Sequence, residues 1–326
     1  MYYSIRHITR FRYSGPVHES VMELRMQPRS ETGQTLRNFQ ITTNPRAQLF
    51  AYTDHVGNAV YHFNVLRQHA ELRIEALSVV EVKDQGALPT ATDALEWQRY
   101  NSFNLSGEHY DLLEESEFAK SSPELQRFIS SRNLEKPAGD PLTALKHLNG
   151  VIHGSFEYEA GVTQVHSPIA QALDQGRGVC QDFTHIMIAI ARQWGVPARY
   201  VSGYLFHRRQ DKDRSSPDET HAWMEAYLPS LGWVGFDPTN NIVVTDRHVR
   251  VAFGRDYADV PPTRGTFKGN VESELGVAVC VESTSAPVRH EEFLRVSKPM
   301  SSPKKPAPTP AQSYYQQQQQ QQQQQQ

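Results

Sequence analysis

One of the two cysteines occupies a position that favours nucleophilic chemistry. Cys180 follows Gly176 and Gly178, and it precedes apolar residues that recur at helical spacing from Phe183 to Trp194. It therefore falls in the first turn of a predicted helix, where unpaired backbone N–H groups carry partial positive charge and favour a thiolate. The backbone N–H of the cysteine could also stabilise an oxyanion.

Two later segments supply the base and the carboxylate that a thiol nucleophile needs. His221 begins one strand-like run and Asp237 ends another, and Leu228-Pro229-Ser230 between them fits a short turn. A hairpin centred on Pro229 places His221 opposite Asp237, on one face of the pair, provided that no bulge shifts the register. Asp237 would then hold one ring nitrogen and leave the other for Cys180.

Each of these residues also has an ordinary structural interpretation. A lone cysteine at a helix start more often packs than reacts, and a lone strand histidine is more often a satisfied polar group. An aspartate before proline usually reflects turn chemistry. The prediction of a catalytic site therefore depends on the combination of the three residues.

Several other residues are predicted to be structural. Asp182, in the first helical turn, is expected to complement the helix dipole. His185 lies on another face of the helix and is expected to be structural or to support the site residues without reacting itself. Cys280 lies in an apolar run and is expected to be inert core.

Motifs for metals and cofactors are missing from the sequence. There is no HExxH motif and no pair of CxxC motifs, so the spacing typical of zinc is absent, and the glycines match no phosphate-binding loop. We therefore expect no metal and no cofactor.

The composition is that of an ordinary globular chain with room for two domains. The 326 residues are 38% hydrophobic and 21% charged, with a formal net charge of -3, so no basic field predicts a nucleic-acid or membrane partner. Two cysteines make no disulfide framework, which indicates a reducing compartment. No signal peptide and no run of about 18 apolar residues is visible, so we expect a cytoplasmic location.

The chain is predicted to divide into four parts. Residues 1–85 alternate between apolar and polar types and predict a small antiparallel β-sandwich. Residues 86–139 form a connecting segment with short helices, and residues 140–285 form the catalytic domain. Residues 286–326 are rich in Pro, Ser and Gln and end in the glutamine tract 316–326, which predicts a disordered tail.

The motifs around these residues resemble those of the bacterial transglutaminase-like superfamily. The matching segments are Gly178-Val179-Cys180-Gln181-Asp182-Phe183, Gly195-Val196-Pro197-Ala198-Arg199-Tyr200-Val201-Ser202-Gly203-Tyr204, His221-Ala222-Trp223, Gly232-Trp233 and Phe236-Asp237-Pro238-Thr239-Asn240-Asn241. The first 85 residues also resemble the β-domain that precedes this core in one bacterial branch.

The resemblance implies an α+β fold with a papain-like core, in which a nucleophile helix packs on an antiparallel sheet. It also implies Cys180 as nucleophile, His221 as base and Asp237 as the orienting carboxylate. No counterpart of the aromatic oxyanion donor of some cross-linkers can be assigned. Weaker candidates for an oxyanion or supporting role are Gln164, Tyr158 and Trp223.

The resemblance leaves the reaction open, because members include cross-linking transferases, proteases, amidases and deglycosylating enzymes. Since nothing in the sequence excludes water, we expect a cysteine peptidase or amidase that forms an acyl thioester with a peptide or amide-containing substrate. A transglutaminase that passes the acyl group to an amine is the alternative. A non-catalytic interaction module on the same fold is the second alternative, and the oligomeric state is not indicated.

Overall fold

The computed structural model describes residues 1–93, 95–105, 107, 109–208 and 210–284. The chain divides into two compact units. Of the described residues, unit 1 contains Met1–Lys83, Pro217–Glu219 and residues 263–284, and unit 2 contains Asp84–Ser216 and Thr220–Pro262. Among the described residues, no helix is both long and apolar enough to cross a membrane.

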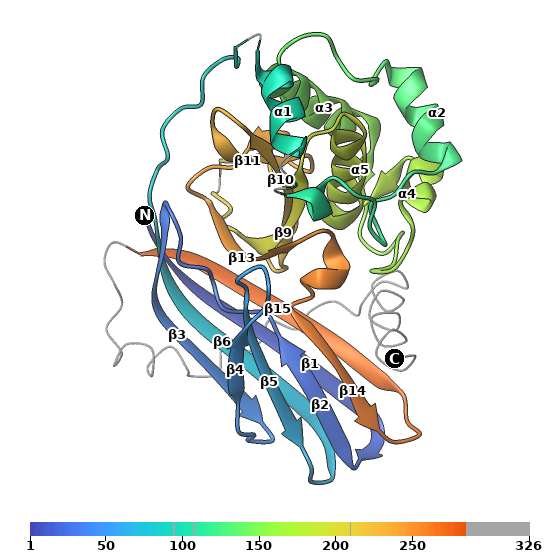
Figure 1. Cartoon of the computed structure of the whole chain (residues 1–326). Coiled ribbons are helices and arrows are strands. Elements are labelled where there is room, and N and C mark those ends of the chain that lie inside the picture. The colour runs from blue at the N-terminus through green and yellow to red at the C-terminus, as the bar shows by residue number, and fades with distance from the viewer. Residues whose placement is uncertain (94, 106, 108, 209, 285–326) are drawn as a thin grey trace. The chain divides into compact units, whose positions relative to one another are not determined.

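Unit 1 is a sandwich of two antiparallel sheets (Figure 1). One sheet has the strand order β15-β1-β6-β3 and the other β14-β2-β5-β4. Phe11 and Leu72 from the first sheet and Leu24 and Phe63 from the second are buried in one hydrophobic cluster. The strands are β1 (Tyr2–Val17), β2 (Glu19–Leu24), β3 (Gln34–Asn44), β4 (Phe50–Thr53), β5 (Ala59–Val65), β6 (His69–Val82), β14 (Thr263–Lys268) and β15 (Ser273–Thr284).

The last two strands belong to unit 1, whereas the sequence analysis placed residues 263–285 in the catalytic domain. β14 pairs with β2, and β15 pairs with β1 from Tyr13↔Ser273 to Tyr2↔Thr284. Local periodicity identifies a strand but carries no information about its partner, so a strand that returns to a distant sheet is assigned to its sequence neighbours. The predicted disordered tail, 286–326, lies outside the described residues.

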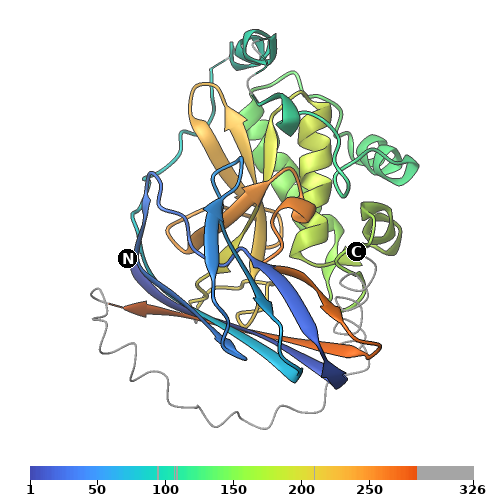
Figure 2. The ribbon, with the colours of Figure 1, turned by 60° about the horizontal axis from the view of Figure 1, so that its bottom comes forward.

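Unit 2 packs helices against a five-stranded antiparallel sheet with the order β12-β11-β10-β9-β13. In both ribbon views the green helices lie on one side of the yellow and orange strands of this unit (Figures 1 and 2). Its helices are α1 (Glu96–Leu105), α2 (Pro123–Arg132), α3 (Pro141–Ser155), α4 (Ile169–Gln175) and α5 (Cys180–Gln193), with 3-10 turns η1 (Tyr110–Leu112) and η2 (Tyr257–Asp259). Its strands are β7 (Glu157–Tyr158), β8 (Arg177–Gly178), β9 (Ala198–Leu205), β10 (His221–Leu228), β11 (Gly232–Asp237), β12 (Ile242–Val243) and β13 (His248–Gly254).

The expected α+β class and the nucleophile helix on an antiparallel sheet are confirmed. α5 contacts both β9 and β10, and its apolar residues Ile186, Met187 and Ile190 are fully buried. Gly195, with φ +81, follows the end of this helix. The helix thus holds its first residue, Cys180, at a fixed place beside the strands.

Candidate active site

The nucleophile candidate is the first residue of α5, and its thiol is partly buried. The short parallel pair of β7 and β8 leads into this helix, with Gly178 beside Tyr158. Val179 is the extended N-cap residue, and its backbone N–H donates to Asp182 Oδ2 at 2.9 Å. This bond closes the first turn of the helix around Cys180.

Asp182 has a larger role than the expected complement to the helix dipole. It is buried, and its Oδ2 also accepts a hydrogen bond from Thr163 Oγ1 at 2.6 Å. Burial raises the pKa of Asp182 to about 6, although these two hydrogen bonds act in the opposite direction. A Cβ atom at Gly178 would lie 2.7 Å from this Oδ2, so the glycine is required for the carboxyl group to reach the helix start.

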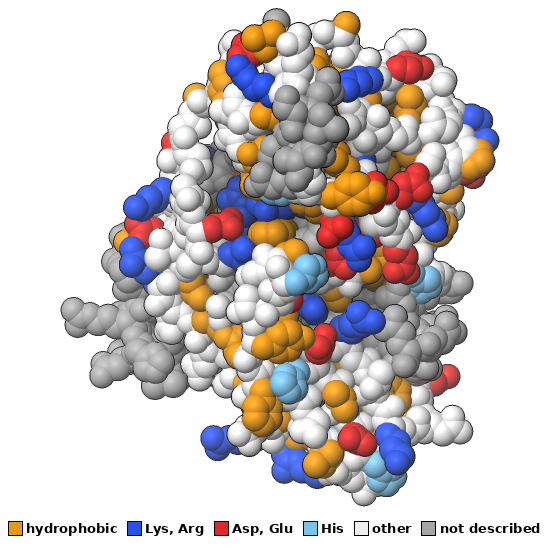
Figure 3. All heavy atoms as spheres, viewed as in Figure 1, with side chains coloured by type: hydrophobic (Ala, Val, Ile, Leu, Met, Phe, Trp, Pro, Cys, Tyr) orange, Lys and Arg blue, Asp and Glu red, His pale blue; other side chains and the backbone are white. Residues whose placement is uncertain are grey.

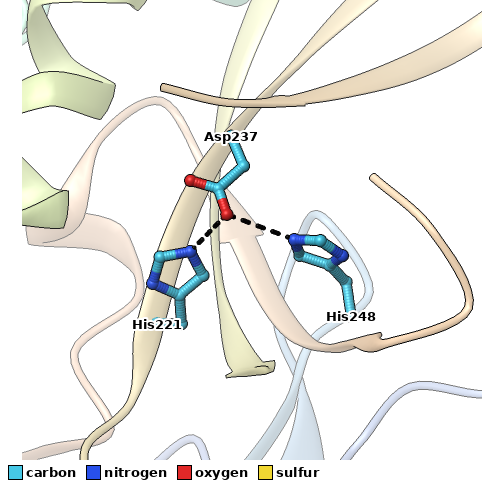
Figure 4. A group of neighbouring side chains, drawn as sticks. All are labelled: His221, Asp237 and His248. Carbon is cyan, nitrogen blue, oxygen red and sulfur yellow. Dashed lines mark hydrogen bonds and ion pairs between the residues drawn. The ribbon is translucent and has the colours of Figure 1, made fainter. Parts of the chain in front are cut away.

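The structure places the predicted base beside the predicted carboxylate. His221 Nε2 lies 2.7 Å from Asp237 Oδ2, and both side chains are buried (Figure 4). His221 is the first residue of β10 and Asp237 is the last of β11, so the hairpin carries both from one end. The proximity that the sequence predicted is therefore present.

The register of this hairpin differs from the predicted one by two residues. Glu225 pairs with Gly235 and Leu228 with Gly232, so the centre lies at Ser230 and not at Pro229. The turn from Leu228 ends on Gly232, whose φ of +77 fits a three-residue loop that closes with a left-handed residue. Because side chains alternate with a period of two, this shift leaves every residue on its predicted face.

Asp237 is surrounded by hydrogen-bond donors. Its Oδ1 accepts from the backbone N–H groups of Thr239 at 3.0 Å and Asn240 at 3.2 Å. Its Oδ2 accepts from Asn240 Nδ2 at 2.9 Å, and His248 Nε2 lies 3.3 Å from the same oxygen. Burial opposes ionisation, but His221 and His248 lower the pKa of Asp237 well below its usual range, so the group is a carboxylate.

The protonation of His221 follows from these neighbours. Burial lowers the pKa of His221, but the charge of Asp237, the hydrogen bond to it and the Cys180 thiol together raise it above the ordinary value. Since Cys180 affects the pKa of His221, its thiol lies close to the imidazole ring. Nδ1 of His221 meets hydrogen-bonding geometry with no group in the described part of the chain, Cys180 included. Nε2 of His221 is thus held by the carboxylate, whereas Nδ1 is buried and has no hydrogen-bond partner among the described residues.

Of the three weaker candidates, the structure places Trp223 beside His221. Tyr158 of β7 lines an open depression that Phe156, Gly176 and Arg214 also line. Gln164 is half-buried, and its backbone N–H donates to Ser167 Oγ. Trp223 is buried with its ring centroid 6.1 Å from that of His221, and its Nε1 has no hydrogen-bond partner among the described residues. Their assignment as oxyanion or supporting groups stays a prediction.

Two further predictions concern residues outside this group. His185 is buried in α5, its Nε2 accepts the N–H of Tyr257, and burial lowers its pKa to about 3, which fits the expected structural role. The prediction that Cys280 is core was wrong, because its side chain is exposed. β15 is an edge strand that buries Val279 on one face, and an unbroken apolar run does not indicate which face is buried.

The structure adds two residues that the sequence analysis did not assign to the site, Asn240 and His248. Asn240 belongs to the segment Asp237-Pro238-Thr239-Asn240 that carried the resemblance, and this was the available signal. His248 has no local signal, because only the pairing of β13 with β9 brings it to the carboxylate.

His221, Asp237 and His248 have ligand atoms within 4.8 Å of one another, a spacing that could hold a metal ion. The hydrogen bonds argue for another use. The backbone N–H of Thr245 donates to His248 Nδ1, so a neutral ring carries its proton on Nε2, the atom that faces the carboxylate. A protonated Nε2 is a donor to Asp237 and has no lone pair for a metal.

Comparisons with known proteins identify the family of the chain. Residues 3–81 match the model of the bacterial transglutaminase-like N-terminal region, and residues 130–238 match that of the transglutaminase-like superfamily. An uncharacterized protein of Mycobacterium leprae is 32% identical over 275 residues, which cover 84% of this chain and 95% of the relative.

Two other proteins extend the comparison. An uncharacterized protein of Mycobacterium tuberculosis is 33% identical over 286 residues, with 84% of this chain and 90% of the relative covered. The solved structure of a candidate cysteine protease from Cytophaga hutchinsonii has a TM-score of 0.66 at 21% identity, and it covers 88% of this chain and 92% of its own. At this identity the likeness concerns the fold.

Proposed function

The chain belongs to the transglutaminase-like superfamily, and from this premise we propose that it is a thiol-dependent hydrolase of amide or peptide bonds. The observation that carries the proposal is the buried pair of His221 and Asp237, in which the remaining imidazole nitrogen has no hydrogen-bond partner among the described residues and Cys180 is a neighbour of the ring. A nucleophile, a base and an orienting carboxylate in this order are the parts that covalent acyl transfer needs.

The first half-reaction forms a thioester. Cys180 Sγ attacks the carbonyl carbon of the amide as a thiolate, whose proton is held by His221 Nδ1. The negative charge passes to the carbonyl oxygen, which the backbone N–H of Cys180 at the start of α5 stabilises. The C–N bond then breaks as His221 returns the proton to the leaving amine, and the acyl group remains on sulfur.

The second half-reaction releases the acid. His221 Nδ1 takes a proton from a water molecule, whose oxygen attacks the thioester carbon, and the C–S bond breaks to leave a free carboxylic acid, the Cys180 thiolate and protonated His221. Throughout both steps Asp237 keeps the imidazole oriented and stabilises its charged form. An amine in the place of water would give the transglutaminase reaction.

The decisive experiment compares Cys180→Ala with Cys280→Ala on a library of peptides and amides. We predict that Cys180→Ala lowers kcat by at least about a thousandfold, because it removes the nucleophile, and that Cys280→Ala retains the parental rate. An iodoacetamide-type probe located by mass spectrometry provides a second readout at both thiols. Full turnover by Cys180→Ala would refute the proposal.

The same library separates the alternatives. Release of ammonia or a free amine without incorporation of a labelled primary amine supports hydrolysis, whereas incorporation of that amine into a glutamine-containing acyl donor supports a transglutaminase. A folded protein that turns over no member of the library and forms no acyl-enzyme supports a non-catalytic module.

A further inference from the structure

The carboxylate of the site lies between two imidazole rings, and the proposed reaction uses only one of them. Figure 4 shows His221 and His248 approaching Asp237 from opposite sides and directing Nε2 at the same oxygen. We propose that His248 is a positioning residue, which fixes the carboxylate of Asp237 on His221 so that Nδ1 of His221 is left for the thiol. The inference rests on the proposed cysteine hydrolase and adds a residue to it.

The first step of the argument is the tautomer of His248. Its Nδ1 lies 3.2 Å from the backbone nitrogen of Thr245, and a backbone N–H can only donate. Nδ1 must therefore accept, and the neutral ring must carry its proton on Nε2. The chain itself, through Thr245, thus sets the direction of the hydrogen bond from His248 to Asp237 at 3.3 Å.

The second step is the effect on His221. Asp237 Oδ2 accepts from His248 and from Asn240 Nδ2, and its Oδ1 accepts from two backbone N–H groups. A carboxylate saturated in this way accepts a proton poorly, so it stays ionised and requires a donor on Nε2 of His221. Whenever the ring of His221 is neutral, its basic lone pair is then confined to Nδ1.

The third step concerns charge. His248 is fully buried, and burial lowers its pKa, so at neutral pH it supplies a donor without a positive charge. A Lys or Arg in its place would neutralise Asp237 and weaken the base. The neighbouring Arg247 is directed elsewhere, because its guanidinium pairs with Asp211 at 2.8 Å and Asp213 at 2.7 Å.

The fourth step is the rigidity of the ring. His248 opens β13, which pairs with β9 through His248↔Leu205, so the backbone is fixed by the sheet. The ring lies edge-on to Trp223, with centroids 5.1 Å apart and an interplanar angle of 75°. A packed aromatic neighbour and a backbone donor on Nδ1 together restrict rotation of the ring away from the carboxylate.

The test replaces His248 by two amide side chains, Gln and Asn, which differ in length by one methylene group. In His248→Gln the side-chain N–H₂ can reach the position of Nε2, whereas in His248→Asn it reaches only the position of Nδ1. We expect kcat to fall about tenfold in His248→Asn, the loss of one hydrogen bond to a charged acceptor, with KM within about twofold of the parent. His248→Gln should retain kcat within about threefold. Equal losses in both variants would overturn the inference.

NMR supplies a second measurement, which needs no turnover. With ¹⁵N-labelled histidine, NMR should show neutral His248 with its proton on Nε2, and the Nε2–H signal of His221 should shift in folded His248→Asn but not in His248→Gln. A proton on Nδ1 of His248, or a charged ring at pH 7, would overturn the positioning role. Because this readout is independent of turnover, failure of the proposed hydrolase and failure of this inference are distinguishable.

Discussion

At the scale of single residues, the start of the nucleophile helix depends on a carboxyl group that burial penalises. Asp182 is 1% exposed, and its pKa is raised from 3.8 to about 6. Because the pKa in the folded protein lies above the ordinary value, the folded state binds the proton more tightly than the unfolded chain. This contribution to stability is fully present below about pH 4 and is lost as the pH rises through about 6.

We predict that Asp182→Asn becomes more stable relative to the parent as the pH rises. Asparagine keeps an oxygen for the Val179 N–H but has no charge to desolvate. The difference in unfolding free energy between variant and parent should therefore increase by roughly 2.5 kcal/mol between pH 4 and pH 8. Urea denaturation at both pH values measures it, and Asp174→Asn at an exposed position controls for the lost charge. A difference that does not change with pH would count against this account.

The residues of the site differ in how far the sequence could predict them. The places of Cys180, His221 and Asp237 on their elements were predictable, because a helix start and a hairpin are local patterns. His248 was not recognisable, since its place depends on a strand pairing between β13 and β9. No periodicity in the sequence encodes that pairing.

At the scale of elements, the central sheet of unit 2 leaves no room for a side chain at Gly203 of β9, beside the site. Gly203 of β9 pairs with His221 of β10 and with Arg250 of β13. A Cβ atom added there would lie 2.2 Å from the backbone oxygen of Val249 and 2.5 Å from the Trp223 ring. Both distances are far below van der Waals contact, and the first involves backbone, which a rotamer change cannot move.

We therefore predict that Gly203→Ala destabilises the protein by about 3 kcal/mol, the upper range for overpacking. It should also reduce turnover, because Trp223 and His221 belong to the strand that has to shift. Thermal denaturation and kcat/KM measure the two effects. The matched control is Gly276→Ala in β15, where the nearest recorded atom is 3.9 Å away. If Gly203→Ala and Gly276→Ala had the same melting temperature, the crowding at Gly203 would be unimportant.

The hairpin shows why a prediction at the level of elements can be correct in face and wrong in register. The sequence identified both strands and the side on which His221 and Asp237 lie, because alternation decides this. The turn was placed on Pro229, but the left-handed Gly232 closes the loop and moves the centre to Ser230. Turn geometry depends on backbone torsions that composition indicates only weakly.

At the scale of the whole molecule, the chain returns to its first unit after completing the second. β14 joins β2 and β15 joins β1, so each sheet of the sandwich includes one strand from near the end of the chain. The backbone oxygen of Asp218, three residues before His221 in the sequence, accepts a hydrogen bond from the Val279 N–H at 2.9 Å. The two units are therefore not successive pieces of sequence. For this reason the predicted catalytic domain, residues 140–285, differs from unit 2.

The surface carries charges of both signs. On the face displayed in Figure 3, blue and red side chains lie among each other and among apolar ones. Together with a net charge of -3, this gives the displayed face no extended basic field of the kind that binds nucleic acid. The absence of nucleic-acid and membrane partners and the cytoplasmic location stay predictions.

The return of the last strands leads to a prediction about truncation. A chain that stops after Pro262 loses β14 and β15, which leaves the edges of β2 and β1 unpaired and removes Leu275 from the hydrophobic cluster of unit 1. We expect such a chain to aggregate or to lose its cooperative thermal transition. A chain that stops after Thr284 keeps every described strand and should melt within about 2 °C of the full chain. Differential scanning calorimetry and light scattering compare the two, and a soluble, cooperatively melting chain that ends at Pro262 would show that unit 1 folds without its C-terminal strands.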